Sequence, residues 1–468
     1  MIKDVVEQLF QEILSQNNKR MPDTSATRKM HLSIRKLLMD TISVSAKTKH
    51  QHWASIHKNK NHYTASRYSN PDITYRIHIE RVYEPLVELG YLKEIKAGLF
   101  TDKERYLTRY EATPKLIALI DPNEVAKFPV HKPVISNPEL IRVRTQVDGF
   151  KQLVEYTDTP QTVEMRNNVK FINDVLSKQW FDLELTDDEF EQLEMRMHQR
   201  SLERNEGEGR LRLQDRMLYR VFNNLEFNEG GRFYGGWWEM VPSEYRRKIL
   251  INGKRTEELD FSTLHPRILY AQAGSSLKGD AYDIKLRPRA IPDGYSQLDF
   301  RTVVKRAFNA MLNARHELRQ PPRELKLKGW GIKWDELVEA IRERHEPIAG
   351  QFFSGAGLRL QFEDSQIAES LMMEFAKTRG LVPLLPVHDS FICHHGYVSE
   401  VKELMVKEFK NRFGIKIKVK AKPEASKQGY KQDETSLDDL LSLKDMSHEL
   451  RLHAYMEINR TEKLDSHL

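Results

Sequence analysis

A proline-marked stretch divides this chain and constrains its architecture more than any other feature. Prolines at 122, 129, 133 and 138 interrupt the segment from Asp121 to Pro138. Because proline cannot continue a helix or donate a hydrogen bond to a sheet, the segment is typical of a linker. A chain of 468 residues also exceeds what one hydrophobic core usually supports. We therefore predict a unit over 1–135, a region over 136–229, a unit over 230–424 and a charged tail over 425–468.

Composition favours a globular protein with a heavily charged surface. Hydrophobic residues make up 39% and charged residues 30% of the chain. The single cysteine, Cys393, excludes an intramolecular disulfide and a cysteine zinc site. No apolar run approaches the length of about 18 residues that spans a bilayer, and the N-terminus lacks a basic segment followed by an apolar one. We expect a cytoplasmic location and no membrane partner. The net charge of +6 gives modest support for a polyanionic partner.

The first unit has the pattern of helices followed by a hairpin. The segment Arg28–Met39 is a basic helix candidate, and apolar residues from Ile79 to Leu86 recur at helical spacing before Gly90. Two strand-like pieces, Tyr91–Lys96 and Arg105–Arg109, then flank a turn-prone segment. This order resembles a winged helix.

Basic and aromatic residues alternate in the same unit, a mixture suited to phosphate contact and base stacking. They are Arg28, Lys29, Arg35, Lys36, Lys47, Lys49, His50, Trp53, Lys58, Lys60, Tyr63, Arg67 and Tyr68. We expect nucleic-acid contact, although winged helices also bind proteins and charge runs are often only exposed surface.

Residues 140–225 have a mostly helical pattern and form a candidate thumb-like element. Its apolar series comprises Met217, Leu218, Val221 and Phe222. The isolated Asp182-Leu183-Glu184 is superficially similar to a proofreading exonuclease motif. We interpret it as an acidic cluster at a helix start, because too few residues separate the linker from Gly230 to form an exonuclease domain.

Three segments between Gly230 and His395 carry the chemistry. In the first, Thr256 to Tyr270, a short strand ending at Asp260 leads into a helix, so the carboxylate is exposed for a metal ion. In the third, Leu384 to Cys393, two apolar runs flank a polar tip that presents Asp389. A turn aspartate that caps its own backbone would give the same pattern.

The second segment, Arg301 to Asn313, is a helix candidate with one polar face. A spacing of four residues aligns Arg301, Lys305, Asn309 and Asn313. Two cations one turn apart are suited to gripping triphosphate, and the amides could meet sugar or base. An ordinary surface helix could show the same pattern. Asp280 and Asp283, which precede this segment, are interpreted as a polar turn.

Together, these segments resemble the motifs of the family A polymerases, which include bacterial repair-type DNA polymerases and phage single-subunit RNA polymerases. Asp260-Phe261-Ser262 with Arg267 resembles the first motif, and Val387-His388-Asp389-Ser390 resembles the third. Arg301 and Lys305 resemble the nucleotide-binding helix. Gly231 to Tyr234 and the later Val241-Pro242 resemble the segments in which the family places template and primer contacts. Gln361 and the helix around Gln366 to Met373 resemble the segment that precedes the family's third motif.

The resemblance implies an α+β fold: a right-hand palm with an antiparallel sheet and helical fingers and thumb, preceded by the winged-helix-like unit. It implies that Asp260 and Asp389 hold two Mg²⁺ ions, or Mn²⁺ in their place, and that His388 positions the primer end. The nucleoside triphosphate would be bound by Phe261, His265, Arg301, Lys305, Asn309 and Asn313. Primer and template would be bound by Arg232, Tyr234, Arg267, Gln361 and Gln366. Arg301 and Lys305 would also stabilise the developing charge.

Three positions depart from the family pattern. His265 stands where family A DNA polymerases have glutamate, and Asn309 and Asn313 replace the usual aromatic residues. The segment around His265-Pro266 also resembles family B, which has tyrosine at the histidine position. We expect a divergent palm polymerase closest to family A, with the branch left open.

The expected activity is DNA-directed DNA synthesis by a two-metal mechanism, without proofreading. The imidazole of His265 would exclude a ribose 2′ hydroxyl. The expected partners are a DNA primer and template, nucleoside triphosphates and replication proteins. The alternatives are a single-subunit RNA polymerase or primase-like enzyme, a metal-dependent nuclease, and a non-catalytic winged-helix initiator or regulator.

Overall fold

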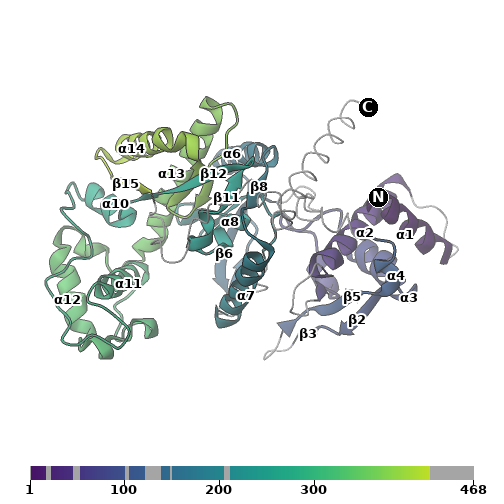
Figure 1. The fold of residues 1–468 in the computed structure, drawn as a ribbon, viewed down its shortest axis with the longest axis horizontal. Coiled ribbons are helices and arrows are strands. Elements are labelled where there is room, and N and C mark those ends of the chain that lie inside the picture. Colours follow the sequence, from purple (N-terminus) through teal and green to yellow (C-terminus); the bar gives the residue numbers. More distant parts are fainter. Residues whose placement is uncertain are drawn as a thin grey trace, which may run out of the picture.

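Two separate hydrophobic cores organise the chain. In the computed structural model we describe residues 2–16, 23–45, 53–100, 105–121, 139–147, 150–204 and 211–421. One core is built from residues between Val5 and Leu116, and the other from residues between Leu140 and Val419. Figure 1 shows the first core at one end of the molecule and the helices α11 and α12 at the other, with the larger sheets between them. The predicted tail over 425–468 lies outside the described residues.

The N-terminal unit packs helices against a small antiparallel sheet. Its sheet has the strand order β1-β5-β2, and a separate hairpin, β3–β4, joins β2 to β5. The elements are α1 (Ile2–Gln16), α2 (Thr24–Ser45), β1 (Ala54–Ile56), η1 (Lys60–Tyr63), η2 (Arg76–Tyr83), α3 (Glu84–Glu88), β2 (Leu92–Lys96), β3 (Leu99–Phe100), β4 (Arg105–Tyr106), β5 (Thr108–Ala112) and α4 (Pro114–Ile117). The predicted helix over 28–39 lies inside α2, and the expected helical spacing from Ile79 to Leu86 falls in η2 and α3.

The larger region carries two sheets. A four-stranded sheet has the order β10-β9-β6-β7, and a six-stranded sheet has the order β13-β14-β12-β11-β8 with β15 paired to β12. Among the strands described, the pairings are antiparallel except that of β6 with β9. The strands are β6 (Ile141–Val147), β7 (Phe150–Leu153), β8 (Phe181–Leu183), β9 (Tyr219–Phe222), β10 (Gly230–Tyr234), β11 (Ile249–Ile251), β12 (Lys254–Phe261), β13 (Leu385–Val387), β14 (Ser390–His394) and β15 (Val419–Ala421). The fold is therefore mixed α+β with largely antiparallel sheets.

The helix α13 joins these sheets to the surrounding helices. It packs against β10 and also contacts α6, α11 and α14. One side of α13 is apolar and buried, with Leu360, Ile367 and Leu371 no more than 2% exposed. The helices of this region are α6 (Pro160–Ser177), α7 (Asp187–Arg204), α8 (Trp237–Met240), α9 (Ser243–Arg246), α10 (Leu264–Gln272), α11 (Asp299–Asn313), η4 (Arg323–Leu325), η5 (Leu327–Trp330), α12 (Trp334–Arg344), η6 (Glu346–Gln351), α13 (Ala356–Thr378), η7 (His395–Tyr397) and α14 (Val398–Phe413). No described helix is both long and apolar enough to cross a membrane.

Residues 136–229 are less helical than the sequence predicted. The helices α6 and α7 lie in this stretch, but so do β6, β7, β8 and β9. The apolar series predicted as helical includes Val221 and Phe222, which belong to β9. Asp182, predicted at a helix start, is instead a fully buried residue of β8. The stretch shares the larger hydrophobic core, because β8 pairs with β11 and β9 with β10.

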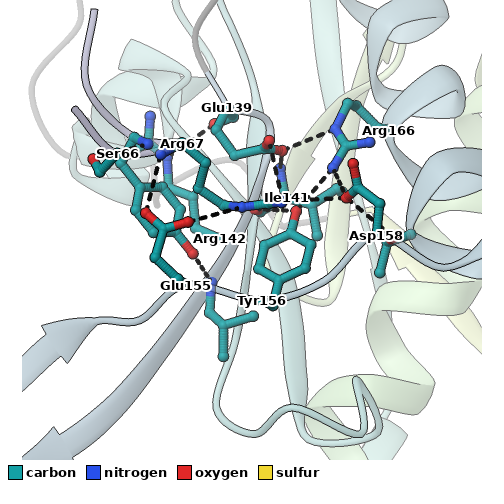
Figure 2. A network of polar contacts seen from close by, with 12 residues as sticks. Ser66, Arg67, Glu139, Ile141, Arg142, Glu155, Tyr156, Asp158 and Arg166 are labelled. Carbon is teal, nitrogen blue, oxygen red and sulfur yellow. Dashed lines mark hydrogen bonds and ion pairs between the residues drawn. The ribbon is translucent and has the colours of Figure 1, made fainter.

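A polar junction joins the N-terminal unit to the larger region (Figure 2). Arg67 lies on the ring of Tyr156, 3.5 Å from its centroid, and forms ion pairs with Glu155 at 3.4 Å and Asp158 at 3.2 Å. The hydroxyl of Tyr68 donates to the carbonyl oxygen of Val154 at 2.6 Å. Arg67 and Tyr68 were predicted to contact nucleic acid. The structure places them in an internal contact instead, because three carboxylates of the larger region surround the guanidinium.

Candidate active site

The structure brings Asp260 and Asp389 together on adjacent strands. Asp260 is the cross-strand partner of Ser390, the residue that directly follows Asp389. Cα atoms paired across an antiparallel ladder lie about 4.5–5.5 Å apart, so the two aspartates are near neighbours. Both residues are half-buried. Residues 129 positions apart in sequence therefore form a single acidic site at the tip of the β13–β14 hairpin.

Alternation along β12 separates this acidic site from the core. Leu259 and Phe261 point into the larger core, where the Phe261 ring lies 6.5 Å from that of Phe391. Glu258 and Asp260 point to the opposite face. The carboxylate of Glu258 is held by Arg246, at 3.0 and 3.2 Å, and accepts a hydrogen bond from Ser390 at 2.5 Å. Phe261 is only 2% exposed, so its side chain belongs to the core and is not placed for the nucleotide contact predicted for this residue.

The hairpin tip itself is strained. His388 has a φ of 57°, a left-handed conformation that residues other than glycine rarely adopt. Such outliers persist where the surrounding structure holds them, often at functional sites. Partial removal of water from the imidazole, and then the nearby Arg232, lower the pKa of His388. His388 is therefore expected to be neutral at neutral pH and able to exchange a hydrogen bond at the predicted primer end.

The predicted nucleotide-binding helix is α11, and its two cations flank one tyrosine. The guanidinium of Arg301 lies 5.0 Å, and the ammonium of Lys305 6.0 Å, from the ring centroid of Tyr282. Burial raises the pKa of Tyr282 to about 12, and the carboxylates of Asp389 and Asp280 add to this shift. Asp389, at the hairpin tip, is thus close enough to α11 for its charge to raise the pKa of the tyrosine that Arg301 and Lys305 flank. Arg301 and Lys305 are exposed.

Arg301 already has an acidic partner. Its guanidinium donates two hydrogen bonds to Asp280, one of 2.9 Å from Nη2. This ion pair lowers the pKa of Asp280. Asp280 was predicted to be part of a polar turn. It is a turn residue and also the ion-pair partner of Arg301. A triphosphate at this helix would compete with the Asp280 carboxylate for the guanidinium.

The two amides of α11 differ in their surroundings. Asn309 is half-buried, whereas Asn313 is exposed at the helix end and donates from its side chain to the carbonyl oxygen of Asn309 at 2.8 Å. The Asn313 amide also lies against Gly357, where an added Cβ would come within 2.0 Å of it. Asn313 therefore fixes the start of α13 against α11, and its predicted nucleotide contact stays a prediction.

A second polar cluster borders the hairpin and is centred on Asp364. Arg232 donates two hydrogen bonds to Asp364, at 2.8 and 2.5 Å, and the imidazole of His265 lies 3.6 Å from the same carboxylate. Burial opposes the charge of Arg232, but Asp364, followed by Asp389, raises the pKa of the guanidinium. Asp364 is only 2% exposed. The predicted primer contact Arg232 and the predicted sugar contact His265 are thus oriented by one carboxylate.

A small pocket opens beside this cluster, between β10, α13 and the hairpin. It is lined by Arg232, Phe233, Asp364, Ser365, Ala368, Pro386 and His388. The predicted template contacts Gln361 and Gln366 lie half-exposed on α13, and Tyr234 is half-exposed on β10. Arg267 donates to the carbonyl oxygen of Ser262 at 3.2 Å, which holds it at the turn between β12 and α10.

The side chains at the hairpin suit magnesium. Mg²⁺ is usually held by one or two carboxylates together with substrate phosphates and waters. Asp260 and Asp389 supply such a pair of hard oxygen ligands. Within the described ranges, no group of three or more histidine, cysteine, aspartate or glutamate side chains is arranged to hold a metal ion. The residues therefore fit an ion that a bound triphosphate helps to hold, rather than an ion enclosed by protein ligands alone.

The sequence analysis missed two residues that complete these clusters. Tyr282 and Asp364 belong to segments with no strong motif, and each meets its partners only after folding. Asp364 is the single buried carboxylate in the first half of α13, and the sequence gives no sign of this burial.

Comparison with known proteins gives little beyond this geometry. No protein-family model and no curated protein matches the sequence. Among solved structures, the chain is similar to the POL domain of Pol1 from M. smegmatis, described in complex with DNA primer-template and dNTP. The two share 14% identity with a TM-score of 0.24, over 44% of this chain and 47% of that chain. The chain therefore spans about half the length of that domain, and at this TM-score the likeness does not establish a common fold.

Proposed function

We propose that this protein is a template-directed nucleotidyltransferase, most specifically a DNA polymerase with a palm-type active site. The observation that carries the proposal is the pairing of Asp260 with Ser390, which brings two carboxylates to one hairpin tip beside the cations of α11. A nuclease would use paired carboxylates too, but it would have no need of Arg301 and Lys305 aligned on one helix face.

The reaction joins a strand end to an incoming nucleotide. A 3′ hydroxyl oxygen forms a bond to the α-phosphorus, the bond from that phosphorus to the bridging oxygen breaks, and pyrophosphate leaves while the hydroxyl proton passes to solvent. Two Mg²⁺ ions held by Asp260 and Asp389 would supply activation of the hydroxyl and charge neutralisation of the leaving group. Arg301 and Lys305 would bind the β- and γ-phosphates and stabilise the charge that develops there. Neutral His388 would orient the strand end.

Selection of the sugar is proposed to depend on His265. Its imidazole is held between Arg232, at 3.5 Å from Nη2, and Asp364, at 3.6 Å. A ring fixed in this way would collide with a 2′ hydroxyl more effectively than a mobile one. We therefore propose deoxynucleotides as the substrates. Equal extension with ribonucleotides, and unchanged selectivity in His265→Gly, would contradict this assignment.

The N-terminal unit is proposed to be a winged helix that binds nucleic acid. Helices packed against a sheet of order β1-β5-β2, with the β3–β4 hairpin as the wing, support this assignment. Several predicted contact residues are engaged internally, including Arg28 with Asp72 and Lys58 with Glu94. Lys47, Lys49 and His50 lie outside the described residues.

The test is primer extension by the full chain with magnesium and labelled primer-template. We expect template-dependent extension by the wild-type protein and a loss of at least about a thousandfold in Asp260→Ala and Asp389→Ala, since each removes a ligand of the metal ions that stabilise the transition state. Asp283→Ala is the matched control, because Asp283 is an exposed carboxylate paired only with Arg287 among the contacts described. No extension by the wild-type protein on any template, together with tight DNA binding, would favour a non-catalytic DNA-binding protein instead.

A further inference from the structure

The four-stranded sheet has one face that its core does not use. Its inner face carries Ile141, Val143 and Phe222, each fully buried. Because side chains alternate along a strand, the opposite face carries a different set. That face carries Arg142 and Arg144 on β6, Tyr219 and Val221 on β9, and Arg232 and Tyr234 on β10. We call the four residues Arg142, Arg144, Tyr219 and Tyr234 the Tyr219 strip. All four residues are half-buried, so part of each reaches the surface.

Three members of the Tyr219 strip, Arg142, Tyr219 and Tyr234, stack on one another across three strands. Tyr219 and Tyr234 are cross-strand partners, and their rings lie 6.2 Å apart with an interplanar angle of 29°. The guanidinium of Arg142 lies 3.6 Å from the Tyr219 ring centroid. A guanidinium held flat on an aromatic ring keeps its N–H edge free to meet a phosphate. The stack therefore presents cations and aromatic rings in fixed positions.

Arg144 adds an unsatisfied donor to the strip. Its Nε is buried and has no hydrogen-bond partner in the part of the chain that the structure describes. The guanidinium lies close enough to Tyr234 to favour ionisation of the phenol, although burial raises the pKa of Tyr234 overall. A buried donor without an acceptor costs free energy, so such groups usually have an acceptor in the functional state. An anion from outside the chain would supply one.

The strip connects the two functional regions of the molecule. At one end, Arg142 donates to the carbonyl oxygen of Glu139 at 3.2 Å, within the junction shown in Figure 2. The hydroxyl of Tyr68, from the N-terminal unit, accepts a hydrogen bond from the neighbouring Val143 at 3.2 Å. At the other end, Arg232 lies two residues before Tyr234 on β10 and belongs to the Asp364 cluster. The strip therefore runs from the N-terminal unit to the candidate active site.

Nearby carboxylates do not cancel the positive charge. Glu139 is engaged by Arg166 at 3.0 Å and by Arg67 at 3.6 Å. Glu239, which lies near Tyr234, is half-buried, and burial raises its pKa to about 8. Its carboxyl is therefore largely protonated at neutral pH. The guanidinium groups of Arg142 and Arg144 are therefore the charges available to an incoming polyanion.

We propose that the Tyr219 strip binds the sugar-phosphate backbone of a nucleic-acid strand that passes between the N-terminal unit and the active site. The proposal rests on the proposed function for the direction of the strand, but its contacts are independent of catalysis. Arg142 and Arg144 contact phosphates, and the exposed edge of Tyr234 contacts sugar or base. Binding through phosphates is independent of sequence.

The first test measures binding in the absence of divalent metal, so that catalysis plays no part. A fluorescent primer-template with a single-stranded overhang is titrated with the full-length protein and with Arg142→Ala/Arg144→Ala at several salt concentrations. We expect the double variant to bind all sequences more weakly and to lower the slope of log affinity against log salt by about 1 for each arginine. Lys402→Ala/Lys410→Ala, on exposed positions of α14, is the charge-matched control and should keep the wild-type slope. A folded double variant with the wild-type slope overturns the proposal.

The second test uses the wild-type protein and so does not depend on a variant that folds. Photoreactive nucleotides are placed one at a time along each strand, and cross-linked peptides are identified by mass spectrometry. Cross-links to Tyr219 or to the β6 segment support the strip, and cross-links confined to other surfaces overturn it. Failure of the polymerase proposal would look different from failure of the strip proposal. If only the polymerase proposal is wrong, the wild-type protein does not extend a primer, but the strip variants still bind nucleic acid more weakly. If the strip alone is wrong, extension persists and the binding slopes are equal.

Discussion

Asp364 sets the geometry of the candidate site at the scale of single residues. It is almost fully buried, accepts two hydrogen bonds from Arg232 and lies 3.6 Å from His265. A buried carboxylate that bonds a guanidinium fixes the side chain in one orientation. Two residues with separate predicted tasks, strand contact and sugar selection, therefore depend on one acid that the motifs do not include.

We expect Asp364→Asn to weaken primer extension without unfolding the protein. A charge-assisted hydrogen bond contributes about 1.5–3 kcal/mol, so kcat/KM should fall by roughly tenfold to a hundredfold. Steady-state extension kinetics measure the effect, with Asp283→Asn as a control of the same chemistry at an exposed position. An Asp364→Asn enzyme as active as this control would show that Asp364 does not orient the site.

Glu239 gives a prediction about pH. Burial raises its pKa to about 8 from an ordinary value of 4.5, so the folded protein holds a proton that the unfolded chain releases. Its contribution to the free energy of unfolding is complete below pH 4.5 and declines as the pH rises to 8, by at most about 1.4 kcal/mol per pH unit. Glu239→Gln, which cannot ionise and can still accept from Gly236, should gain stability relative to the wild type as pH rises. Thermal melts at acidic and alkaline pH measure this, and a constant difference at every pH would contradict it.

The motif residues could be singled out from the sequence, whereas their partners could not. Asp389 lies between two short apolar runs, and Asp260 ends a short strand-like segment that leads into a helix pattern. Both features are visible without a fold. Asp364 gains its meaning from Arg232, 132 positions away, and Tyr282 gains its meaning from burial and from Asp389, 107 positions away. A sequence pattern shows neither distant partners nor burial. Phe261 shows the converse, since a residue inside a motif proved to be a core residue.

At the scale of elements, the contact of β10 with α13 holds the site together. Beneath the Asp364 cluster, the fully buried Arg220 of β9 donates to Glu369 at 2.6 Å, to Ser365 at 2.9 Å and to the carbonyl oxygen of Gly231 at 2.8 Å. Gly231 has a φ of 78°, and an added Cβ would come within 2.9 Å of Ser365. The close approach of strand and helix thus needs both a glycine and a buried ion pair.

Breaking that ion pair should cost much more than removing it entirely. Arg220→Leu leaves Glu369 buried without its cation, and we expect a loss of about 3–5 kcal/mol in the free energy of unfolding. The double variant Arg220→Leu/Glu369→Leu should recover a large part of this loss. Chemical denaturation monitored by circular dichroism measures both. Equal stability of the single and double variants would show that the lost packing, rather than the stranded charge, dominates.

Element type was predictable where periodicity is long and uncertain where it is short. The helix α2 and the strands around β12 and β14 follow sustained patterns. The series at Met217, Leu218, Val221 and Phe222 fits a helical face as well as a strand. Pairing with β6, almost 80 residues earlier, made it a strand, and no local signal encodes such a pairing.

At the scale of the whole molecule, Arg67 links two bodies with separate cores through several of the contacts that the described residues make. Its side chain is 18% exposed, stacks on Tyr156 and meets three carboxylates. Tyr68, beside it, packs against the larger core. The orientation of the N-terminal unit therefore depends on a small polar contact rather than on a shared apolar interior.

Replacing this arginine should loosen the molecule without unfolding either body. For Arg67→Ala we expect an increased radius of gyration in solution scattering, because the guanidinium is the centre of the junction. Arg28→Ala is the control, since Arg28 pairs with Asp72 inside the N-terminal unit. Unchanged scattering of Arg67→Ala would mean that Tyr68 alone maintains the arrangement.

Separate interiors also make the two bodies exchangeable. Each buries its own apolar residues, and the described contacts between them are a few hydrogen bonds, ion pairs and one packed ring. A different N-terminal unit could precede β6, provided that it placed an arginine and a tyrosine where Arg67 and Tyr68 meet Tyr156 and Val154. Evolution, or a protein engineer, could then join the larger region to a unit with a different binding preference without altering a single residue of the β13–β14 hairpin.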